Sequence, residues 1–399
     1  MNIIFLTNDE IQSIDASGIF TDLLRRFSVN GHTVYVVCAN ERRNNERTNV
    51  SIDNNVHVLR VKTGNITQVN MLEKGVSTLL VGYQFKKAIN KHFKFVKFDL
   101  ILYSTPPITL LSAVTYLKKR DGACTYLMLK DIFPQNAVDI GILKFDSLIY
   151  KHFRKVEKKF YDISDKIGCM SPANVNYLLK ENVNIPKHAV EICPNTIDPL
   201  DINLSRDDIS FIRNKYDIPT DKLVFIYGGN IGKPQDVNFI MECIEACTGM
   251  DFFFLIIGSG TDFYKLESYV SIKNPSNLKL IRKVPKQDYE MIVKASDVGL
   301  IFLDHRFTIP NFPSRILSYM QASLPVLAAT DKNTDIGEII KEGEFGDWCE
   351  SKDPNVFVKK MEQFLDKSKS TKMGKNARRY LEENSTSQHA YEIIMKHFK

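Results

Sequence analysis

Residues 308–329 read TIPNFPSRILSYMQASLPVLAA. A loop punctuated by two prolines precedes a short run with helical spacing, and Ser314 stands where the N-cap of that helix is expected. Residues 326–329 form an apolar run that is typical of a buried parallel strand. A helix N-terminus offers free N–H groups to an anion, and Arg315 adds a cation there. The stretch predicts either an anion site or an ordinary βα connection with an exposed arginine.

Apolar runs and helix-spaced segments alternate along the rest of the chain. We expect strands at residues 2–6, 34–38, 56–61, 100–103, 124–129, 166–170, 190–193, 223–227, 252–257, 278–281 and 297–303. We expect helices at residues 19–29, 83–98, 108–119, 148–163, 236–248, 289–295, 355–364, 372–382 and 388–398. This alternation predicts an α/β fold with parallel sheets built from right-handed βαβ units.

The length of 399 residues favours two domains. The polar segment 199–221 separates two α/β halves, so we expect domains at 1–198 and 222–375 with 199–221 as the linker. The seven cysteines lack metal-ligand spacing, which predicts reduced thiols and no metal site. We find no signal-peptide pattern and no apolar run that could span a bilayer, so a cytoplasmic protein is expected.

The net charge of +6 is uneven, because residues 1–200 hold 26 Lys and Arg against 19 Asp and Glu, whereas residues 201–399 hold 27 against 28. Residues 83–98 carry five lysines and no acid, interleaved with apolar residues. The plainer interpretation is a solvated helix face packed on a sheet. The alternative is contact with an anionic membrane surface, to which the basic residues within 151–159 would add. No motif accompanies this charge, so we expect no nucleic-acid partner.

Two further groups of residues stand where chemistry is expected. Glycine-rich turns follow the strands at 223–227 and 252–257, and such turns let the backbone approach a phosphate closely. Asp131 follows the strand at 124–129, at the sheet edge where ligands bind in α/β folds, although it could simply begin a turn. The chain has no G-x-G-x-x-G, so a dinucleotide fingerprint is absent.

Residues 313–328 resemble the segment P-S-K-L-x-E-Y-M-A-x-G-K-P-V-L-A of family 4 glycosyltransferases. Residues 229–232, 129–134 and 193–195 add matches to the bacterial subgroup that builds O-antigens and capsules, including fucosamine-type transferases. The resemblance implies the GT-B fold, in which two Rossmann-like domains face each other across a cleft. It also implies that C-terminal helices, here 376–399, return toward the N-terminal domain.

Carried over by position, the resemblance implies a donor site and an acceptor site. The donor-binding residues would be Gly229, Asn230, Lys233, Gly258, Arg282, Val284, Ser314, Arg315 and Ser318. The acceptor-binding residues would be Ser17, Gly18, Lys130 and Asp131. Arg315 would hold the donor diphosphate, residues 281–285 would contact the base, and Asp131 would face the reacting sugar. Asp131 and Arg315 would therefore be the catalytic residues.

Several positions depart from the family pattern. The family often has Arg and Lys where this chain has Asn230 and Gln235. Its paired glutamates, eight residues apart, correspond here to Pro310 and Ser318. A serine would make only one weaker hydrogen bond to the ribose hydroxyls that a glutamate would grip.

The resemblance implies a retaining transfer from a nucleotide-diphosphate sugar without a metal or other cofactor. We expect a UDP-linked donor, an N-acetylated hexosamine or a deoxyhexosamine, and an undecaprenyl-diphosphate-linked saccharide acceptor. Residues 83–98 would then dock the protein on the inner face of the cell membrane. Two alternatives stay open: a degenerate GT-B protein that binds a nucleotide sugar or a partner transferase without turnover, and a 2-epimerase-like enzyme.

Overall fold

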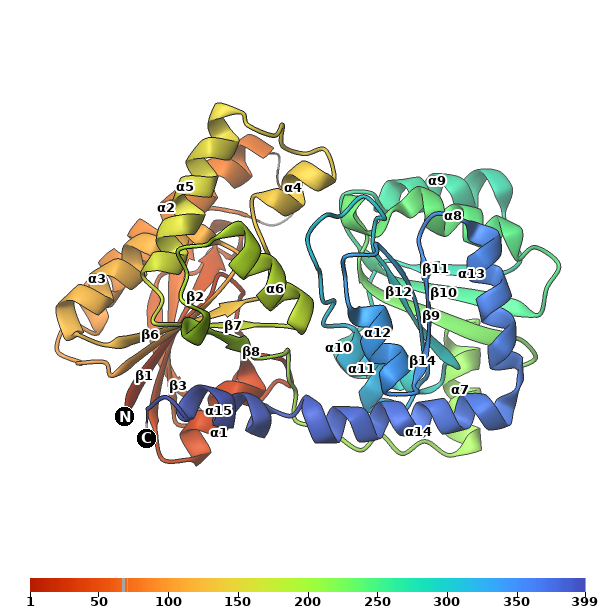
Figure 1. Cartoon of the computed structure of the whole chain (residues 1–399). Coiled ribbons are helices and arrows are strands. Elements are labelled where there is room, and N and C mark those ends of the chain that lie inside the picture. The colour runs from red at the N-terminus through yellow and green to blue at the C-terminus, as the bar shows by residue number, and fades with distance from the viewer. Residues whose placement is uncertain (67–68, 70, 399) are drawn as a thin grey trace. The chain divides into compact units, whose positions relative to one another are not determined.

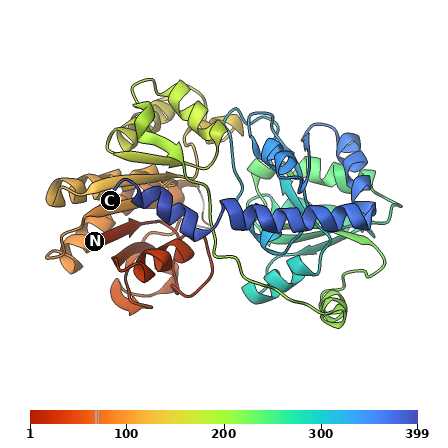
Figure 2. The same cartoon turned by 60° about the horizontal axis from the view of Figure 1, so that its bottom comes forward.

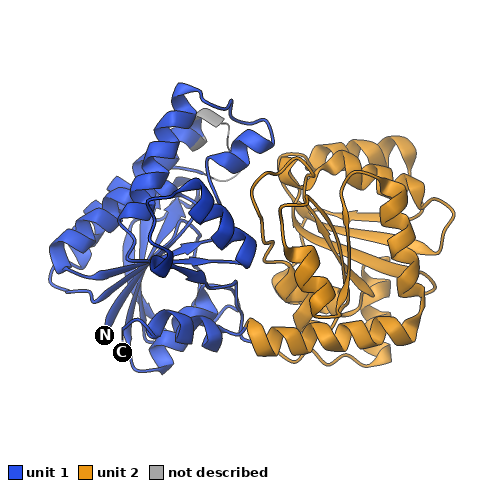
Figure 3. Ribbon diagram, viewed as in Figure 1, with its two compact units in different colours: residues 1–198, 386–399 blue, residues 199–385 orange. Residues whose placement is uncertain are grey.

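The computed structural model describes residues 1–66, 69 and 71–398, which form two compact units. Unit 1 comprises Met1–Asp198 with Thr386–Lys399, and unit 2 comprises Pro199–Ser385 (Figure 3). Each unit contains a parallel β-sheet flanked by helices, so the predicted α/β class is confirmed. The segment expected to be a linker lies within unit 2 and contains helix α7 (Arg206–Lys215).

Unit 1 is built on an eight-stranded sheet with the strand order β3-β4-β2-β1-β5-β6-β7-β8 (Figure 1). Its strands are β1 (Asn2–Leu6), β2 (Thr33–Glu41), β3 (Asn49–Asp53), β4 (Val56–Thr63), β5 (Leu100–Ser104), β6 (Cys124–Leu129), β7 (Lys166–Cys169) and β8 (Val190–Ile192). Every neighbouring pair is parallel except β3–β4. The carboxyl ends of the parallel strands share one edge, the carboxyl edge of unit 1.

Strand β3 was not predicted, and the local sequence explains how it forms. It pairs antiparallel with β4 through a turn at Asn54 and Asn55, whose φ angles are +47° and +61°. Asparagine tolerates this left-handed conformation, and two such residues form the tight hairpin turns that join antiparallel strands. The Asn-Asn pair between two alternating segments was therefore a usable hairpin signal.

Within residues 1–198, the helices of unit 1 are α1 (Thr21–Val29), α2 (Met71–His92), α3 (Leu111–Asp121), α4 (Gln135–Asp139), α5 (Leu148–Asp162) and α6 (Pro172–Glu181). Short 3-10 turns are η1 (Arg42–Asn44), η2 (Ile108–Leu110) and η3 (Lys187–Ala189). The predicted bounds of 83–98 were wrong, because α2 starts earlier and ends at His92. Two glycines and several β-branched residues weaken the local helix signal before residue 83. In the structure, this part of α2 packs closely on the segment at Thr109. A Cβ on Gly82 would lie 2.2 Å from the carbonyl oxygen of Thr109, so only glycine fits there.

The apolar side of the predicted basic helix faces the interior of unit 1. Phe85, Ile89 and Phe93 are buried, whereas the lysines of this segment are exposed. This arrangement is the plainer alternative, a solvated helix face packed on a sheet. Across the part of the chain that the structure describes, no helix combines the length and hydropathy needed to cross a membrane.

Unit 2 is built on a six-stranded, fully parallel sheet with the order β11-β10-β9-β12-β13-β14. Its strands are β9 (Leu223–Asn230), β10 (Phe252–Ser259), β11 (Leu278–Ile281), β12 (Val298–Phe302), β13 (Val326–Thr330) and β14 (Gly346–Glu350). Its remaining helices are α8 (Val237–Ala246), α9 (Phe263–Lys273), α10 (Lys286–Lys294), α11 (Ile316–Gln321), α12 (Ile336–Glu342), α13 (Pro354–Met361) and α14 (Lys367–Asn384), with 3-10 turns η4 (Lys233–Gln235) and η5 (Glu362–Leu365). The predicted strand at 326–329 is confirmed as β13.

The chain ends in unit 1. Helix α14 belongs to unit 2 as a whole, so the chain passes to unit 1 after Ser385, later than the predicted start at 376. Helix α15 (Ser387–Met395) packs beside α1, as Figures 1 and 2 show. The ring of Tyr391 lies 5.2 Å from that of Phe27, and a bridge joins Ile197 to Thr386.

Candidate functional site

The carboxyl edge of unit 2 is lined by glycines where β9 and β10 end. Gly229 and Gly258 are paired in register on these strands. A Cβ on Gly258 would lie 1.9 Å from the carbonyl oxygen of Gly229, and Gly229 itself has a φ of +129°. Neither position accepts a side chain without distortion, so the exposed backbone of Gly229 is open to a close approach by a ligand.

The turn after β9 is closed by a glutamine. The side-chain oxygen of Gln235 accepts hydrogen bonds from Asn230 Nδ2 and from the Gly232 N–H, both at 3.0 Å. Asn230 and Gln235, which stand where the family often has cations, are therefore hydrogen-bonded to each other and stabilise the turn. Lys233 lies exposed in η4 and is the remaining cation of this turn.

Arg315 lies against the end of β9. Its guanidinium stacks 4.2 Å from the ring centroid of Tyr227, and Nη1 donates a 2.8 Å hydrogen bond to the carbonyl oxygen of Gly228. A Cβ on Gly229 would lie 3.2 Å from Nη1, which places the cation directly beside the glycine turn. Its Nε is buried and has no hydrogen-bond partner among the described residues. The arrangement leaves donor capacity beside an open glycine backbone.

The predicted N-cap at Ser314 was wrong. Helix α11 begins at Ile316, and Arg315 occupies the N-cap position without a side-chain cap. The N–H groups of Ile316 and Leu317 bond instead to the carbonyls of Pro313 and Ser314, at 3.3 and 3.1 Å. This tighter turn satisfies backbone donors without the hydroxyl of Ser314, which is exposed. The anion-binding potential here therefore rests on the guanidinium and the glycines more than on the short helix.

Two tyrosines that the sequence analysis did not single out complete this corner. Tyr319 is fully buried; its hydroxyl accepts from the Gly228 N–H at 3.3 Å and donates to the Leu300 carbonyl at 3.0 Å. Tyr289 reaches the same glycine, because a Cβ on Gly228 would lie 2.0 Å from its hydroxyl oxygen. Burial raises the pKa of Tyr289 to about 12, and the charge of Arg315 opposes the shift. Tyr319 lies within the stretch 308–329, so its position there was an available signal.

The loop that leads to Arg315 is fastened by the loop after β13. The Thr334 hydroxyl accepts from the Asn311 N–H at 2.8 Å and donates to the Asn311 carbonyl at 3.1 Å. Asp331 is fully buried, and its Oδ1 accepts the N–H groups of Asn333 and Thr334, both at 2.8 Å. Burial raises the pKa of Asp331 to about 6. These bonds fix the loop between β12 and α11 from a neighbouring strand.

The side chains of the other predicted donor residues make their contacts elsewhere. Arg282 pairs with both carboxylate oxygens of Glu267 at 2.7 Å and stacks 4.5 Å from the ring of Phe263. Val284 is half-buried after β11, and Ser318 is half-buried on α11. Within residues 1–66, 69 and 71–398, no hydrogen bond or ring contact joins the side chains of Lys233, Arg282, Val284, Ser314 or Ser318 to Gly229, Gly258 or Arg315.

Three residues near the same edge have the donor atoms of a metal site. The ligand atoms of Asp236, Asp304 and His305 lie within 4.8 Å of one another. Arg306 already binds the buried carboxylate of Asp304, with Nε 2.9 and 3.1 Å from its two oxygens. A metal would have to displace this guanidinium, so we interpret the three residues and Arg306 as an ion-pair network.

Asp131 follows β6 at the carboxyl edge of unit 1. Its two carboxylate oxygens lie 2.8 and 2.7 Å from Asn136 Nδ2, which donates to them. Thr105 holds the backbone, because its hydroxyl accepts from the Lys130 N–H at 3.0 Å and donates to the Asp131 carbonyl at 3.0 Å. Burial raises the pKa of Asp131 to about 6, and the hydrogen bonds from Ile132 and Asn136 oppose the shift. The hydrogen bonds thus hold the carboxylate in one orientation, and burial shifts its pKa toward the protonated form.

The other predicted acceptor residues line the same edge of the sheet. Burial lowers the pKa of Lys130, whose Nζ lies 3.5 Å from the carbonyl oxygen of Pro194. Ser17 and Gly18 precede α1, in the loop that follows β1. The Gly18 N–H donates to Asp22 Oδ1 at 3.0 Å. Strand β5 separates β1 from β6, so these two loops emerge one strand apart.

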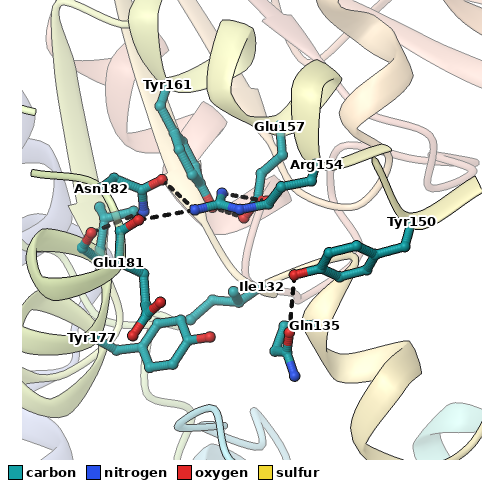
Figure 4. Close-up of a pocket in the computed structure, with 10 residues that line it drawn as sticks. Ile132, Gln135, Tyr150, Arg154, Glu157, Tyr161, Tyr177, Glu181 and Asn182 are labelled. Atoms are coloured by element: carbon teal, nitrogen blue, oxygen red, sulfur yellow. Dashed lines mark hydrogen bonds and ion pairs between the residues drawn. The ribbon is translucent and has the colours of Figure 1, made fainter. Parts of the chain in front are cut away.

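A small polar pocket lies close to Asp131 along the chain, between α4, α5 and α6 (Figure 4). Its lining residues are Ile132, Gln135, Tyr150, Arg154, Glu157, Tyr161, Tyr177, Leu178, Glu181 and Asn182. Arg154 binds Glu157 at 2.6 Å and Asn182 at 2.7 Å, and Tyr161 donates to Glu157 at 2.7 Å. The cavity of about 30 Å³ has room for roughly two water molecules. The cavity is too small for a sugar. Its polar side chains form hydrogen bonds within α5 and from α5 to Asn182.

Known proteins resemble the chain both in sequence and in structure. Residues 208–380, which lie in unit 2, match the family described as "Glycosyl transferases group 1". "Probable glycosyltransferase WbjE" of Pseudomonas aeruginosa is 26% identical over 302 residues, 74% of this chain and 73% of that protein. WcaI of Escherichia coli strain K12, named for colanic acid biosynthesis, is 20% identical over 247 residues, 60% of each chain. These matches support a group 1 glycosyltransferase.

Solved structures extend the likeness to the whole chain. Sucrose-phosphate synthase from Thermosynechococcus elongatus has a TM-score of 0.75 at 13% identity, covering 100% of this chain and 98% of that one. The Anabaena protein HepE in complex with UDP-glucose has a TM-score of 0.69 at 13% identity, covering 100% and 99%. The expected GT-B fold is therefore confirmed.

Proposed function

We propose that this protein is a retaining, metal-independent glycosyltransferase that moves a sugar from a UDP-sugar to a lipid-linked saccharide. The observation that carries the proposal is the cationic, glycine-lined corner of Arg315, Tyr227 and Gly229 at the carboxyl edge of unit 2. A diphosphate binds where the backbone lets it approach closely and where a charged fork supplies hydrogen-bond donors, and the glycine turn and the guanidinium of Arg315 support this. UDP and UDP-sugar complexes of structurally similar proteins favour uridine as the base.

The chemistry follows from the charge that develops on the leaving group. The bond between the anomeric carbon and the phosphate oxygen breaks, and UDP departs with the bonding electron pair. Arg315 neutralises this charge, with Lys233 as a second cation, and the glycine backbone supplies further donors. Because retention requires attack on the face that UDP leaves, the acceptor proton passes to the departing phosphate oxygen nearby.

Asp131 acts on the acceptor side of the reaction in this proposal. Its ionised carboxylate accepts a hydrogen bond from a sugar hydroxyl and stabilises the oxocarbenium-like carbon. Asn136 fixes its orientation at 2.8 and 2.7 Å. Lys130, Ser17 and Gly18 line the same edge and contact the acceptor. The remaining donor contacts would come from Asn230, Gly258, Arg282, Val284, Ser314 and Ser318.

The pathway proposed for the enzyme is surface polysaccharide synthesis, in capsule or O-antigen. The name of WcaI refers to colanic acid biosynthesis and supports this class of pathway. The donor sugar would be an N-acetylated hexosamine or a deoxyhexosamine. The acceptor would be an undecaprenyl-diphosphate-linked saccharide on the inner face of the cell membrane, with the exposed lysines of residues 83–98 facing anionic lipid.

The test measures nucleotide binding and turnover with the purified full chain. Calorimetry with UDP should give binding that Arg315→Ala weakens by about tenfold or more, because one charge-assisted fork is lost. Arg206→Ala removes an exposed arginine of unit 2 and serves as the matched control. A panel of UDP-sugars with an extracted lipid-linked acceptor should give product, with or without a chelator. Tight UDP binding without any turnover would instead favour the degenerate binding protein.

A further inference from the structure

Gly228, near the end of β9, meets side chains from three other positions in unit 2. Its N–H donates to the Tyr319 hydroxyl at 3.3 Å, and its carbonyl oxygen accepts from Arg315 Nη1 at 2.8 Å. Tyr289 covers the side where a Cβ would lie, 2.0 Å from the hydroxyl oxygen and 2.5 Å from two ring carbons. A side chain at Gly228 would push this ring away. The glycine therefore lets the Tyr289 hydroxyl lie at the base of the glycine turn.

Helix α10 holds Tyr289 on the sheet from its first turn. Ile292 and Val293 are buried three and four residues later, so Tyr289 shares the face of α10 that packs on the sheet. The same turn is tied to the end of α7, because the carboxylate of Asp288 accepts from the Tyr216 hydroxyl. Helix α10 also packs against α11, and Figure 1 shows the two helices side by side. The ring of Tyr289 is therefore held by several neighbouring elements of unit 2.

The tyrosines at this corner differ in how their hydroxyls are used. The hydroxyl of Tyr227 donates to the Asn230 carbonyl at 2.6 Å, and that of Tyr319 donates to the Leu300 carbonyl at 3.0 Å. The side chain of Tyr289 is only half-buried, and its hydroxyl has no hydrogen-bond partner in the part of the chain that the structure describes. Burial raises the pKa of Tyr289 to about 12, so this hydroxyl carries its proton at neutral pH and can donate it to a ligand.

The charge beside this hydroxyl is positive. Among residues 1–66, 69 and 71–398, no carboxylate pairs with the guanidinium of Arg315, and its buried Nε has no hydrogen-bond partner. Its charge acts against the burial that raises the pKa of Tyr289, as a neighbouring cation should. An unpaired guanidinium next to a free O–H donor favours an anion with several oxygens. A phosphate group fits this description.

We infer that the Tyr289 hydroxyl donates a hydrogen bond to the donor diphosphate, on the same phosphate that Arg315 binds. The inference rests on the proposed function, because it requires a nucleotide diphosphate at this corner. Arg315 supplies the charge and the exposed backbone of Gly229 allows the close approach. Tyr289 adds a neutral donor whose direction is set by the packed ring. No spacing in the sequence indicated this role, since α10 and Arg315 meet only through the fold.

The experiment is calorimetry of the full chain with UDP, inorganic diphosphate and uridine, with weak ligands measured by their displacement of UDP. Tyr289→Phe keeps the ring against Gly228 and removes only the hydroxyl. It should weaken the binding of UDP and of inorganic diphosphate by about tenfold, because a hydrogen bond to a charged group is lost. Uridine has no phosphate, so its affinity should not change. Tyr269→Phe, at a half-buried tyrosine on α9, is the matched control and should bind like wild type.

A double-mutant cycle tests whether the two side chains share one phosphate. Tyr289→Phe should weaken UDP binding less in the Arg315→Ala background than in wild type, because the phosphate is no longer held beside the hydroxyl. Fully additive losses would overturn the inference, and so would an equal loss for UDP and uridine. An unchanged UDP affinity of Tyr289→Phe, with binding that still depends on Arg315, would overturn the inference alone. A wild-type protein that binds no UDP would instead overturn the proposed function and the inference together.

Discussion

The guanidinium of Arg315 lies 4.2 Å from the ring centroid of Tyr227, although the two residues are 88 positions apart in the chain. The same tyrosine donates its hydroxyl to the carbonyl of Asn230 at 2.6 Å. One ring therefore links the cation to the glycine turn. This contact predicts that the donor site depends on Tyr227 as well as on the arginine.

Replacing Tyr227 by Leu should weaken UDP binding by about tenfold, since the cation loses the ring face that orients it. Tyr227→Phe keeps the ring and should retain most of the affinity. Calorimetry with UDP measures both, and circular dichroism checks that each variant folds, because Tyr227 is fully buried. Equal affinity of the Leu and Phe variants would show that the stacked ring does not support binding.

Gly258→Ala should disrupt both stability and donor binding. The new Cβ would lie 1.9 Å from the Gly229 carbonyl oxygen, so the strands must shift at a cost of about 1–3 kcal/mol. Gly75→Ala is the control, because it sits in helix α2 and its Cβ would meet no described atom within 4 Å beyond its chain neighbours and the local helix backbone. That control should raise the free energy of unfolding by roughly 0.5–1 kcal/mol. Urea unfolding followed by UDP titration separates the two effects, and a Gly258→Ala protein as stable as wild type would contradict the packing argument.

The pKa of Asp131 predicts opposite pH dependences of stability and activity. The folded-state pKa is raised to about 6 from 3.8, so the fold favours the protonated carboxyl. The stability from this group is fully present below 3.8 and is lost as the pH rises through about 6. Above pH 6, Asp131→Asn should therefore have a free energy of unfolding about 1–3 kcal/mol higher than that of wild type, while turnover is lost.

The matching measurement is urea unfolding of wild type and Asp131→Asn at several pH values. Comparing the two proteins isolates Asp131 from Asp331, whose pKa is also raised to about 6. Wild-type kcat should rise with pH around a midpoint near 6, as the carboxylate forms. Asp221→Asn, at an exposed position, should change neither profile. An Asp131→Asn protein with full activity would remove Asp131 from the mechanism.

Ser318→Glu tests whether α11 faces the ribose of the donor. Ser318 is half-buried on α11, three residues after Arg315. A carboxylate there would accept hydrogen bonds from both ribose hydroxyls and should raise UDP affinity by about tenfold. Affinity for inorganic diphosphate, which has no ribose, should not rise. A gain for both ligands, or for neither, would place the ribose elsewhere.

Much of the architecture was predictable from local patterns, because strand and helix periodicities are properties of neighbouring residues. These patterns predict the two α/β halves, the strand after Pro325 and the glycine turns. The missed features depend on distant partners. Helix α2 extends before residue 83, where Gly82 packs closely on Thr109, a contact with a residue distant in the chain. The N-cap of α11 lies at Arg315, where a tight turn satisfies the backbone donors.

By itself, the sequence determined that two glycine-punctuated α/β units exist and that Arg315 follows a strand and precedes a helix. These properties follow from the spacing of residues along the chain, which does not depend on which strands pair with one another. Only the tertiary structure decided which groups meet. It stacks Arg315 on Tyr227, joins Gln235 to Asn230 in place of two cations, and buries the apolar face of residues 83–93 while exposing that of residues 76–83. The physical reason is that parallel strands distant in sequence must first pair in register before their carboxyl ends, and the side chains on them, share one edge.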